Sequence, residues 1–215
     1  MSGPNRTEKH PVAKPRVGRA VTLLAAIWLG MLLVGASDPE QAILTSVHVT
    51  ERPWVVPVLA ITQLGDWTIL LALPFLAAAW LTYRRQRRLA LLVIAAPILG
   101  RLLVEAQKGL MGRLRPAQDN PMVIAESFAY PSGHAANAMI VFLLLALLLV
   151  DDDRRRRWAI AAAILLSVAV GITRVLLGVH WPSDVVGGWA FGLMWVLLTW
   201  RYAHTLKRNS STSPS

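Results

Sequence analysis

Basic residues, a histidine and a carboxylate stand together at the end of an apolar stretch near residue 175. Residues 172–184 read ITRVLLGVHWPSD, and they follow a run that is almost wholly apolar. A neutral imidazole can attack phosphorus to form a phosphohistidine, and a carboxylate on its second ring nitrogen selects the tautomer that this attack requires. Asp184 follows His180 by four residues, where the next apolar segment begins. We therefore expect His180 to be a nucleophile and Asp184 to orient it.

A second polar stretch, residues 108–135, holds further basic residues between two apolar segments. Cationic side chains are costly in apolar surroundings, roughly 2.5–3.5 kcal/mol each at the centre of a membrane helix, so a cluster of them indicates a place that receives an anion. The guanidinium fork and the lysine point charge are the usual partners of phosphoryl oxygens. We predict that Lys108, Arg115 and Arg174 bind a phosphate, and we interpret Arg113 as a solvated loop charge outside the site.

Residues 131–134, PSGH, come directly before an apolar segment that is expected to be a helix. Free backbone N–H groups and the helix dipole favour an anion at a helix N-terminus, and a glycine lets the backbone approach it closely. Ser132 and Gly133 are therefore predicted to bind the phosphate, and His134 to protonate the leaving oxygen as a general acid. These polar stretches have no HExxH pattern, clustered Asp or helix-spaced His pair, so we predict neither a metal nor a cofactor.

The elements that must position these groups are apolar helices. The chain has 215 residues, of which 55% are hydrophobic, and its mean hydropathy is +0.49; a soluble domain is typically about 45–50% apolar. The charge of +10 does not indicate nucleic acid, because most basic residues lie in clusters between apolar runs. Six runs are found, and they predict an all-α bundle of six transmembrane helices. The runs lie near 20–36, 67–83, 89–107, 135–150, 158–179 and 185–200.

The distribution of Lys and Arg predicts how this bundle is oriented. With the N-terminus in the cytoplasm and six crossings, the cytoplasmic segments hold sixteen Lys and Arg and the outer segments five. This positive-inside bias places both termini in the cytoplasm of a multi-pass protein of the cell membrane. The two polar stretches then meet at the extracytoplasmic interface, where we expect the active site.

Several other features carry structural rather than chemical predictions. We expect disorder in 1–18 and 206–215, a single domain over 19–205, and an interfacial or lid-like segment at 51–66. Arg101 and Glu105 share a helix face and are interpreted as a pair that supports the site. Gly188 and Gly192 are predicted to allow close helix packing.

The three motifs, in this order, resemble the type 2 phosphatidic acid phosphatase superfamily of membrane lipid phosphatases. Its pattern is Lys-x6-Arg-Pro, then Pro-Ser-Gly-His, then Ser-Arg-x5-His-x3-Asp. This chain has KGLMGRLRP, PSGH and TRVLLGVHWPSD, with every required spacing kept and Thr173 in place of the pattern's Ser. The resemblance covers roughly residues 60–200. The family also includes soluble vanadium haloperoxidases, a branch that the apolar spans argue against.

The resemblance implies a metal-independent phosphatase that acts on a lipid phosphate or diphosphate in the membrane, with the residue roles given above. Phosphatidylglycerol phosphate, phosphatidic acid and polyprenyl diphosphate all offer a suitable phosphate. Three alternatives stay open: a phosphotransferase that uses the same phosphohistidine, a small-molecule phosphatase with a water-facing pocket, and a non-enzymatic transporter or scaffold. The substrate and the oligomeric state cannot be predicted from these residues.

Overall fold

The regular secondary structure in the part of the chain that the structure describes is all α-helix. The computed structural model describes residues 17–48, 52–117, 123 and 127–210, and no strand occurs among them. Its helices are α1 (Val17–Val34), α2 (Asp38–Val47), α3 (Arg52–Gln63), α4 (Trp67–Tyr83), α5 (Arg87–Met111), α6 (Gly133–Leu149), α7 (Asp153–Leu176) and α8 (Pro182–Ser210). The predicted all-α fold is therefore confirmed, and the six predicted apolar runs correspond to α1 and to α4 through α8.

Most of these helices have the length and composition of membrane spans. Five described segments meet both requirements, and they are Val17–Val34, Pro53–Tyr83, Arg87–Met111, Asp153–Leu176 and Pro182–His204. The second of them combines α3 and α4, which a turn at residues 64–66 separates. Helix α6 is apolar but has only 17 residues. The count of six spans therefore remains a prediction.

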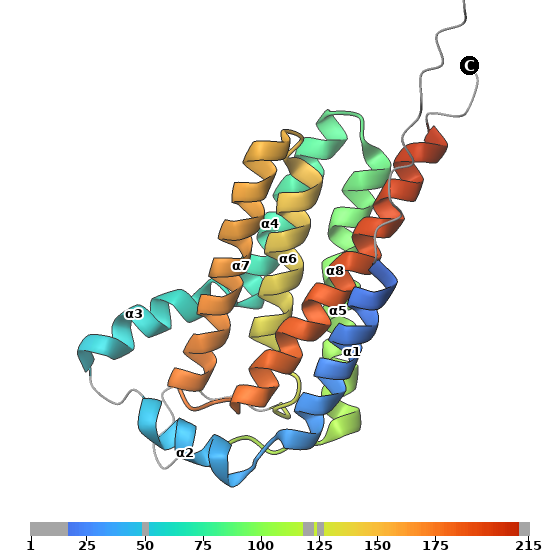
Figure 1. Cartoon of the computed structure of the whole chain (residues 1–215). Helices are drawn as coiled ribbons and strands as arrows, with labels where there is room; N and C mark the ends of the chain where they lie inside the picture. The colour runs from blue at the N-terminus through green and yellow to red at the C-terminus, as the bar shows by residue number, and fades with distance from the viewer. Residues whose placement is uncertain (1–16, 49–51, 118–122, 124–126, 211–215) are drawn as a thin grey trace, which may run out of the picture.

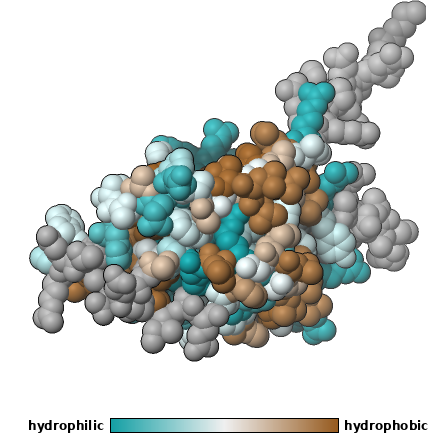
Figure 2. All heavy atoms as spheres, turned by 90° about the horizontal axis from the view of Figure 1, so that it is seen from below, coloured by the Kyte–Doolittle hydropathy of each residue, from teal (hydrophilic) through white to brown (hydrophobic). Residues whose placement is uncertain are grey.

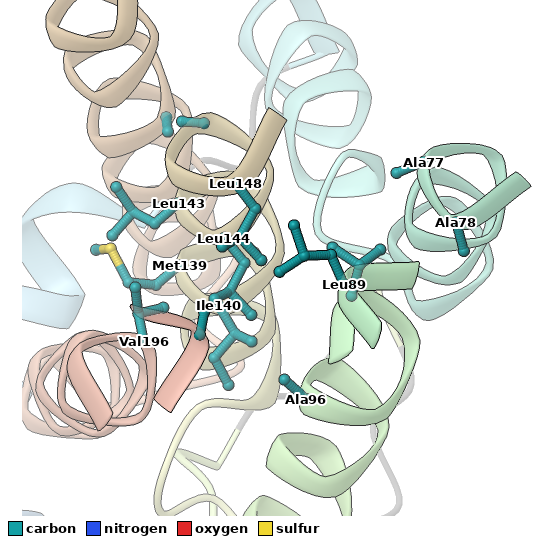
Figure 3. Close-up of a cluster of buried hydrophobic side chains, with 14 of the residues drawn as sticks. Ala77, Ala78, Leu89, Ala96, Met139, Ile140, Leu143, Leu144, Leu148 and Val196 are labelled. Atoms are coloured by element: carbon teal, nitrogen blue, oxygen red, sulfur yellow. The ribbon is translucent and has the colours of Figure 1, made fainter. Parts of the chain in front are cut away.

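The centre of the bundle is α6, which is buried along most of its length between its neighbours. Met139, Ile140, Leu143 and Leu144 lie between α5 and α8 in the main apolar cluster (Figure 3). Small residues allow α8 to approach α6 closely, since a Cβ added at Gly192 would lie 2.7 Å from the Ala136 carbonyl oxygen. Such close approach stabilises helix pairs in lipid, and it confirms the packing role predicted for Gly188 and Gly192.

Helix ends at the polar end of the bundle follow local sequence signals. Gly112 ends α5 and Gly178 follows α7, both with positive φ (60° and 65°), which glycine adopts without steric cost. Pro182 begins α8, because proline fits the first turn of a helix. Helix α1 begins at Val17 and α8 continues to Ser210, so the helices extend past the predicted boundaries at 18 and 205. The disorder expected in 1–16 and 211–215 lies outside the described residues.

Helices α2 and α3 lie at one end of the bundle, away from the loops α4–α5 and α6–α7 (Figure 1). Helix α2 crosses beneath the ends of α7 and α8, and α3 runs sideways away from the bundle axis. Seen from this end, hydrophilic and hydrophobic residues lie side by side on the surface (Figure 2). The predicted lid-like segment 51–66 is thus mainly the helix α3, and its function as a lid stays a prediction.

Candidate active site

The described residues enclose a cavity of about 800 Å³ at this end of the bundle. Its walls come from α3, the start of α4, the end of α5, the start of α6, the end of α7 and the segments that follow α5 and α7. Of the predicted site residues, it is lined by Lys108, Arg115, Gly133, His134, Arg174 and His180. Ser132 and Asp184 are fully buried and lie outside the cavity lining. The tertiary structure thus brings the three motifs to one place.

Two buried cations form one side of the cavity. Lys108 is 7% exposed, and its Nζ lies 3.3 Å from Glu105 Oε1 and 3.1 Å from Ser127 Oγ. Arg174 is 3% exposed and donates from Nη1 to Thr62 Oγ1 at 2.9 Å, while its Nε has no partner. A buried donor without a partner costs free energy, so this guanidinium is suited to an anion that enters the cavity.

The contacts of His180 indicate which ring nitrogen carries its proton. Arg115 Nη1 lies 3.0 Å from His180 Nε2. Arginine only donates hydrogen bonds, so Nε2 is the acceptor and the proton is on Nδ1. Nδ1 lies 3.3 Å from Asp184 Oδ2. This arrangement keeps Nε2 unprotonated, with its lone pair accepting from Arg115, so a phosphoryl group must displace this donor before Nε2 can attack phosphorus.

Arg115 is itself held mainly by backbone oxygen atoms. It donates to the carbonyls of Ser127 and Val179, each at 2.7 Å. Burial lowers the pKa of Arg115 from its ordinary value, and Asp184 and Glu105 act in the opposite direction.

The pKa of His180 is lowered well below its ordinary value of 6.5. The largest cause is burial, and the nearby cations Arg115, Arg174 and Lys108 lower it further. Both effects disfavour the imidazolium. The ring therefore stays neutral, which is the nucleophilic form.

The start of α6 supplies a place for phosphoryl oxygens. Ser132 is the N-cap of α6, and its Oγ is buried without a hydrogen-bond partner. A Cβ added at Gly133 would lie 3.4 Å from Lys108 Nζ, so any side chain there would fill space beside this cation. The predicted position of both residues at a helix N-terminus is confirmed, and the Ser132 hydroxyl has no protein partner.

His134 lies on the first turn of α6 and lines the same cavity as His180. The backbone of Gly65 approaches it closely, since a Cβ added at Gly65 would lie 3.1 Å from His134 Cδ2. The two histidines therefore share one cavity, as a general acid and a nucleophile that act on the same substrate must.

The interpretation of Arg113 as a solvated loop charge is wrong. Its side chain is only 9% exposed, and Nη1 lies 2.7 Å from Asp184 Oδ1. The predicted pair of Arg101 and Glu105 is present, with Nη2 and Oε1 3.8 Å apart, and Glu105 also contacts Lys108. Sequence spacing alone could not show that Arg113 is buried, because the burial comes from contacts with α1 and α8.

Sequence reasoning also missed polar residues that line the cavity. Asn137 is 3% exposed and its Oδ1 has no partner. It lies one turn after His134 in an apolar helix, and this spacing was a usable signal. Thr62 comes from α3, where nothing in the local sequence marks it. Among the described residues, no three His, Cys, Asp or Glu side chains gather as metal ligands.

Comparison with known proteins finds similarity to phosphatases of one family. Residues 87–208 match the family model described as the PAP2 superfamily. Phosphatidylglycerophosphatase B of Bacillus subtilis is 33% identical over 176 residues, which are 79% of this chain and 85% of that protein. An undecaprenyl-diphosphatase of Sulfolobus acidocaldarius is 32% identical over 120 residues, 54% of this chain and 55% of that one.

A solved structure shares the fold. The crystal structure described as the first transmembrane PAP2 type phosphatidylglycerolphosphate phosphatase, from Bacillus subtilis, superposes with a TM-score of 0.81 at 30% identity. The match covers 88% of this chain and 98% of that one. The similarity therefore includes helices that precede the matched family region.

Proposed function

The chain belongs to the PAP2 superfamily and is a multi-pass membrane phosphatase, and on that premise we propose that it hydrolyses a lipid phosphate through a phosphohistidine on His180. The observation that carries this proposal is the position of His180 between Asp184 and Arg115. It supports a neutral imidazole whose unprotonated Nε2 accepts from Arg115 beside a cavity lined by cations.

The first half of the reaction transfers the phosphoryl group to the protein. Nε2 of His180 attacks phosphorus, a P–N bond forms and the P–O bond to the lipid breaks. His134 protonates the leaving oxygen, so the lipid leaves as an alcohol. Lys108, Arg115 and Arg174, with the Ser132 hydroxyl and the N–H groups at Gly133, stabilise the phosphoryl oxygens. Asp184 holds the proton on Nδ1 and stabilises the imidazolium that develops.

The second half returns the protein to its starting state. A water molecule attacks the phosphohistidine, and His134 accepts its proton. The P–N bond breaks and inorganic phosphate leaves. An alcohol in place of water would give a phosphotransferase, so the ratio of free phosphate to phosphorylated acceptor separates the two reactions.

The similarity to phosphatidylglycerophosphatase B over most of the chain favours phosphatidylglycerol phosphate as the first substrate to test. The undecaprenyl-diphosphatase match makes polyprenyl diphosphate the second candidate. Purified protein should be assayed in detergent with both lipids, phosphatidic acid and a short-chain phosphate ester. Equal turnover of the short-chain ester would indicate a water-facing pocket for small molecules instead.

The nucleophile is tested by His180→Ala. We expect turnover to fall by about 10⁴-fold or more, because phosphohistidine formation is lost. Rapid quench of the wild-type protein with ³²P-labelled substrate should give an acid-labile, base-stable label that this variant lacks. Substantial phosphate release by folded His180→Ala would remove His180 from the role.

We further propose that the cavity opens on the extracytoplasmic side. The excess of Lys and Arg at the other end of the bundle supports this orientation. The native chain has no cysteine, so single cysteines at Ala117 and at Asp152 give clean probes. A membrane-impermeant thiol reagent on intact cells should label position 117 and spare position 152. The opposite labelling would invert the topology.

A further inference from the structure

Arg113 contacts five groups from three separate parts of the chain. Its Nη1 donates to Ser183 Oγ at 2.9 Å and to Asp184 Oδ1 at 2.7 Å. Its Nη2 donates to the carbonyl oxygens of Met31 and Leu32 in the last turns of α1. The guanidinium also lies over the ring of Tyr130, 4.4 Å from its centroid.

These contacts fix the orientation of the Asp184 carboxylate. Arg113 binds Oδ1, while the backbone N–H of Trp181 donates to Oδ2 at 2.9 Å. His180 Nδ1 also faces Oδ2, at 3.3 Å. With a donor on each oxygen, the carboxylate cannot turn about its Cβ–Cγ bond without breaking one of these hydrogen bonds. The carboxylate is fully buried, and a buried charge of this kind requires a partner.

A buried glutamate of α2 completes the same network. Glu40 is 5% exposed, and its Oε1 accepts from the backbone N–H of Ser183 at 2.6 Å. Its Oε2 accepts from Ser183 Oγ at 3.0 Å and from the backbone N–H of Ala36 at 2.9 Å. A carboxylate is favoured at the N-terminus of a helix, here α8. Helices α1 and α2 are thereby joined to the turn that carries Asp184.

We propose that Arg113 is a positioning residue, which holds the Asp184 carboxylate against His180 and couples the end of α1 to the active site. Arg113 does not line the cavity, so it acts through Asp184 and not on the substrate. The inference rests on the proposed function, because the orientation of Asp184 matters to the rate only if His180 is the nucleophile.

A positioning role and a purely structural role differ in what they change. If Arg113 only tied α1 to the bundle, its loss would lower stability while the remaining folded protein kept its kcat. If it orients Asp184, its loss lowers kcat in folded protein and leaves KM nearly unchanged, since the phosphate contacts remain. A small guanidinium ion that enters the space left by the side chain would then restore part of the rate.

The test compares Arg113→Ala and Arg113→Lys with wild-type protein and with Arg156→Ala. Arg156 is the matched control, because its pair with Asp153 lies at the other end of the bundle and both side chains are at least one-third exposed. We expect Arg113→Ala to lower kcat by about 10–100-fold, the usual effect of losing a group that orients a reacting residue, with KM changed by less than about twofold. Millimolar methylguanidinium should raise its kcat several-fold and should not affect Arg156→Ala.

Arg113→Lys keeps the charge but lacks the planar fork, so it cannot hold Asp184 and the α1 carbonyls together. We expect the kcat of Arg113→Lys to fall at least about threefold. If Arg113→Ala does not accumulate as folded protein, Arg113→Lys alone decides the test. Wild-type kcat in either folded variant, or a loss that resides wholly in KM, would overturn the inference. An active His180→Ala would instead overturn the proposed function, so the two failures are distinguishable.

Discussion

Arginines are found at both ends of the bundle, and their surroundings differ sharply. At the cavity end, Arg113 and Arg174 are almost fully buried, and their partners are distant in sequence, such as Asp184 and Thr62. At the opposite end, two arginines, one at the end of α4 and one in the first turn of α7, have local partners. Arg156 pairs with Asp153 three residues away, and Arg84 lies over the ring of Trp80.

The difference shows that the role of an arginine depends on how much of its solvation the surrounding protein removes. Exposed ion pairs contribute roughly 0–1 kcal/mol because water solvates both partners. A buried guanidinium has lost that solvation, so it needs a protein partner or an incoming anion. On the proposed orientation and function, we expect the basic end to set the orientation in the membrane and the charges at the cavity end to act in the chemistry. Matched substitutions at the two ends test this distinction.

The largest contrast is expected between Arg174→Gln and Arg84→Gln. Arg174 lines the cavity and its buried Nε has no partner, and losing a preorganised donor to transition-state charge costs about 10²–10³-fold in rate. We expect a loss of that size in kcat/KM for Arg174→Gln and less than about a twofold change for Arg84→Gln. Phosphate release from phosphatidylglycerol phosphate, at equal amounts of folded protein, measures both. Similar kcat/KM values for the two variants would remove Arg174 from the phosphate site.

A smaller contrast is expected between two glycines at the cavity end. In Gly133→Ala the new methyl group would lie 3.4 Å from Lys108 Nζ, where a phosphoryl oxygen is expected to bind. A displacement of the substrate by about 1 Å can cost on the order of 10²-fold, and we expect kcat/KM to fall by about 10–100-fold. Gly109→Ala places its methyl in open space on α5. It should keep full activity and gain about 0.5–1 kcal/mol of stability, as an alanine in a helix does. Full activity in Gly133→Ala would mean that the anion binds elsewhere in the cavity.

The smallest effect is expected on the pH profile. His180 attacks only as the neutral ring, and its pKa is held well below 6.5 by burial first and by Arg115 next. The acid limb of kcat/KM due to His180 should therefore lie below pH 6.5. Removing a neighbouring cation raises the pKa of His180, so Arg115→Gln should move this limb to higher pH. Arg84→Gln should leave the acid limb at its wild-type pH. Both assays use the same substrate, so the titration of the substrate itself does not affect the comparison. A limb that does not move would show that Arg115 leaves the His180 proton unaffected.

Much of the fold and of the candidate site was predictable from local patterns. The apolar runs predicted the long helices because each run is a continuous segment, and its period and length depend on neighbouring residues alone. Pro182, Gly178 and Ser132 marked helix ends for the same reason. His180 and Asp184 were predictable because four residues at a helix start bring their side chains within reach of each other.

The rest depended on contacts between distant segments. Arg113 was misinterpreted because its burial comes from the end of α1 and from Asp184, which are separated from it by 82 and 71 residues. Glu40 and Thr62 carry no local signal, although one binds the start of α8 and the other Arg174. Asn137 was the exception, since its spacing from His134 was visible in the sequence.

The amino-acid sequence by itself determined which segments are apolar helices, which residues can do phosphoryl chemistry and which end of the bundle is basic. These properties follow from composition, from spacing within one helix and from charge, so they need no knowledge of the neighbours. The tertiary structure decided which cations lose water, which carboxylate each of them meets and which polar atoms are left for an anion. Those outcomes depend on burial and on hydrogen bonds between helices, because desolvation is a property of the packed assembly and not of the residue.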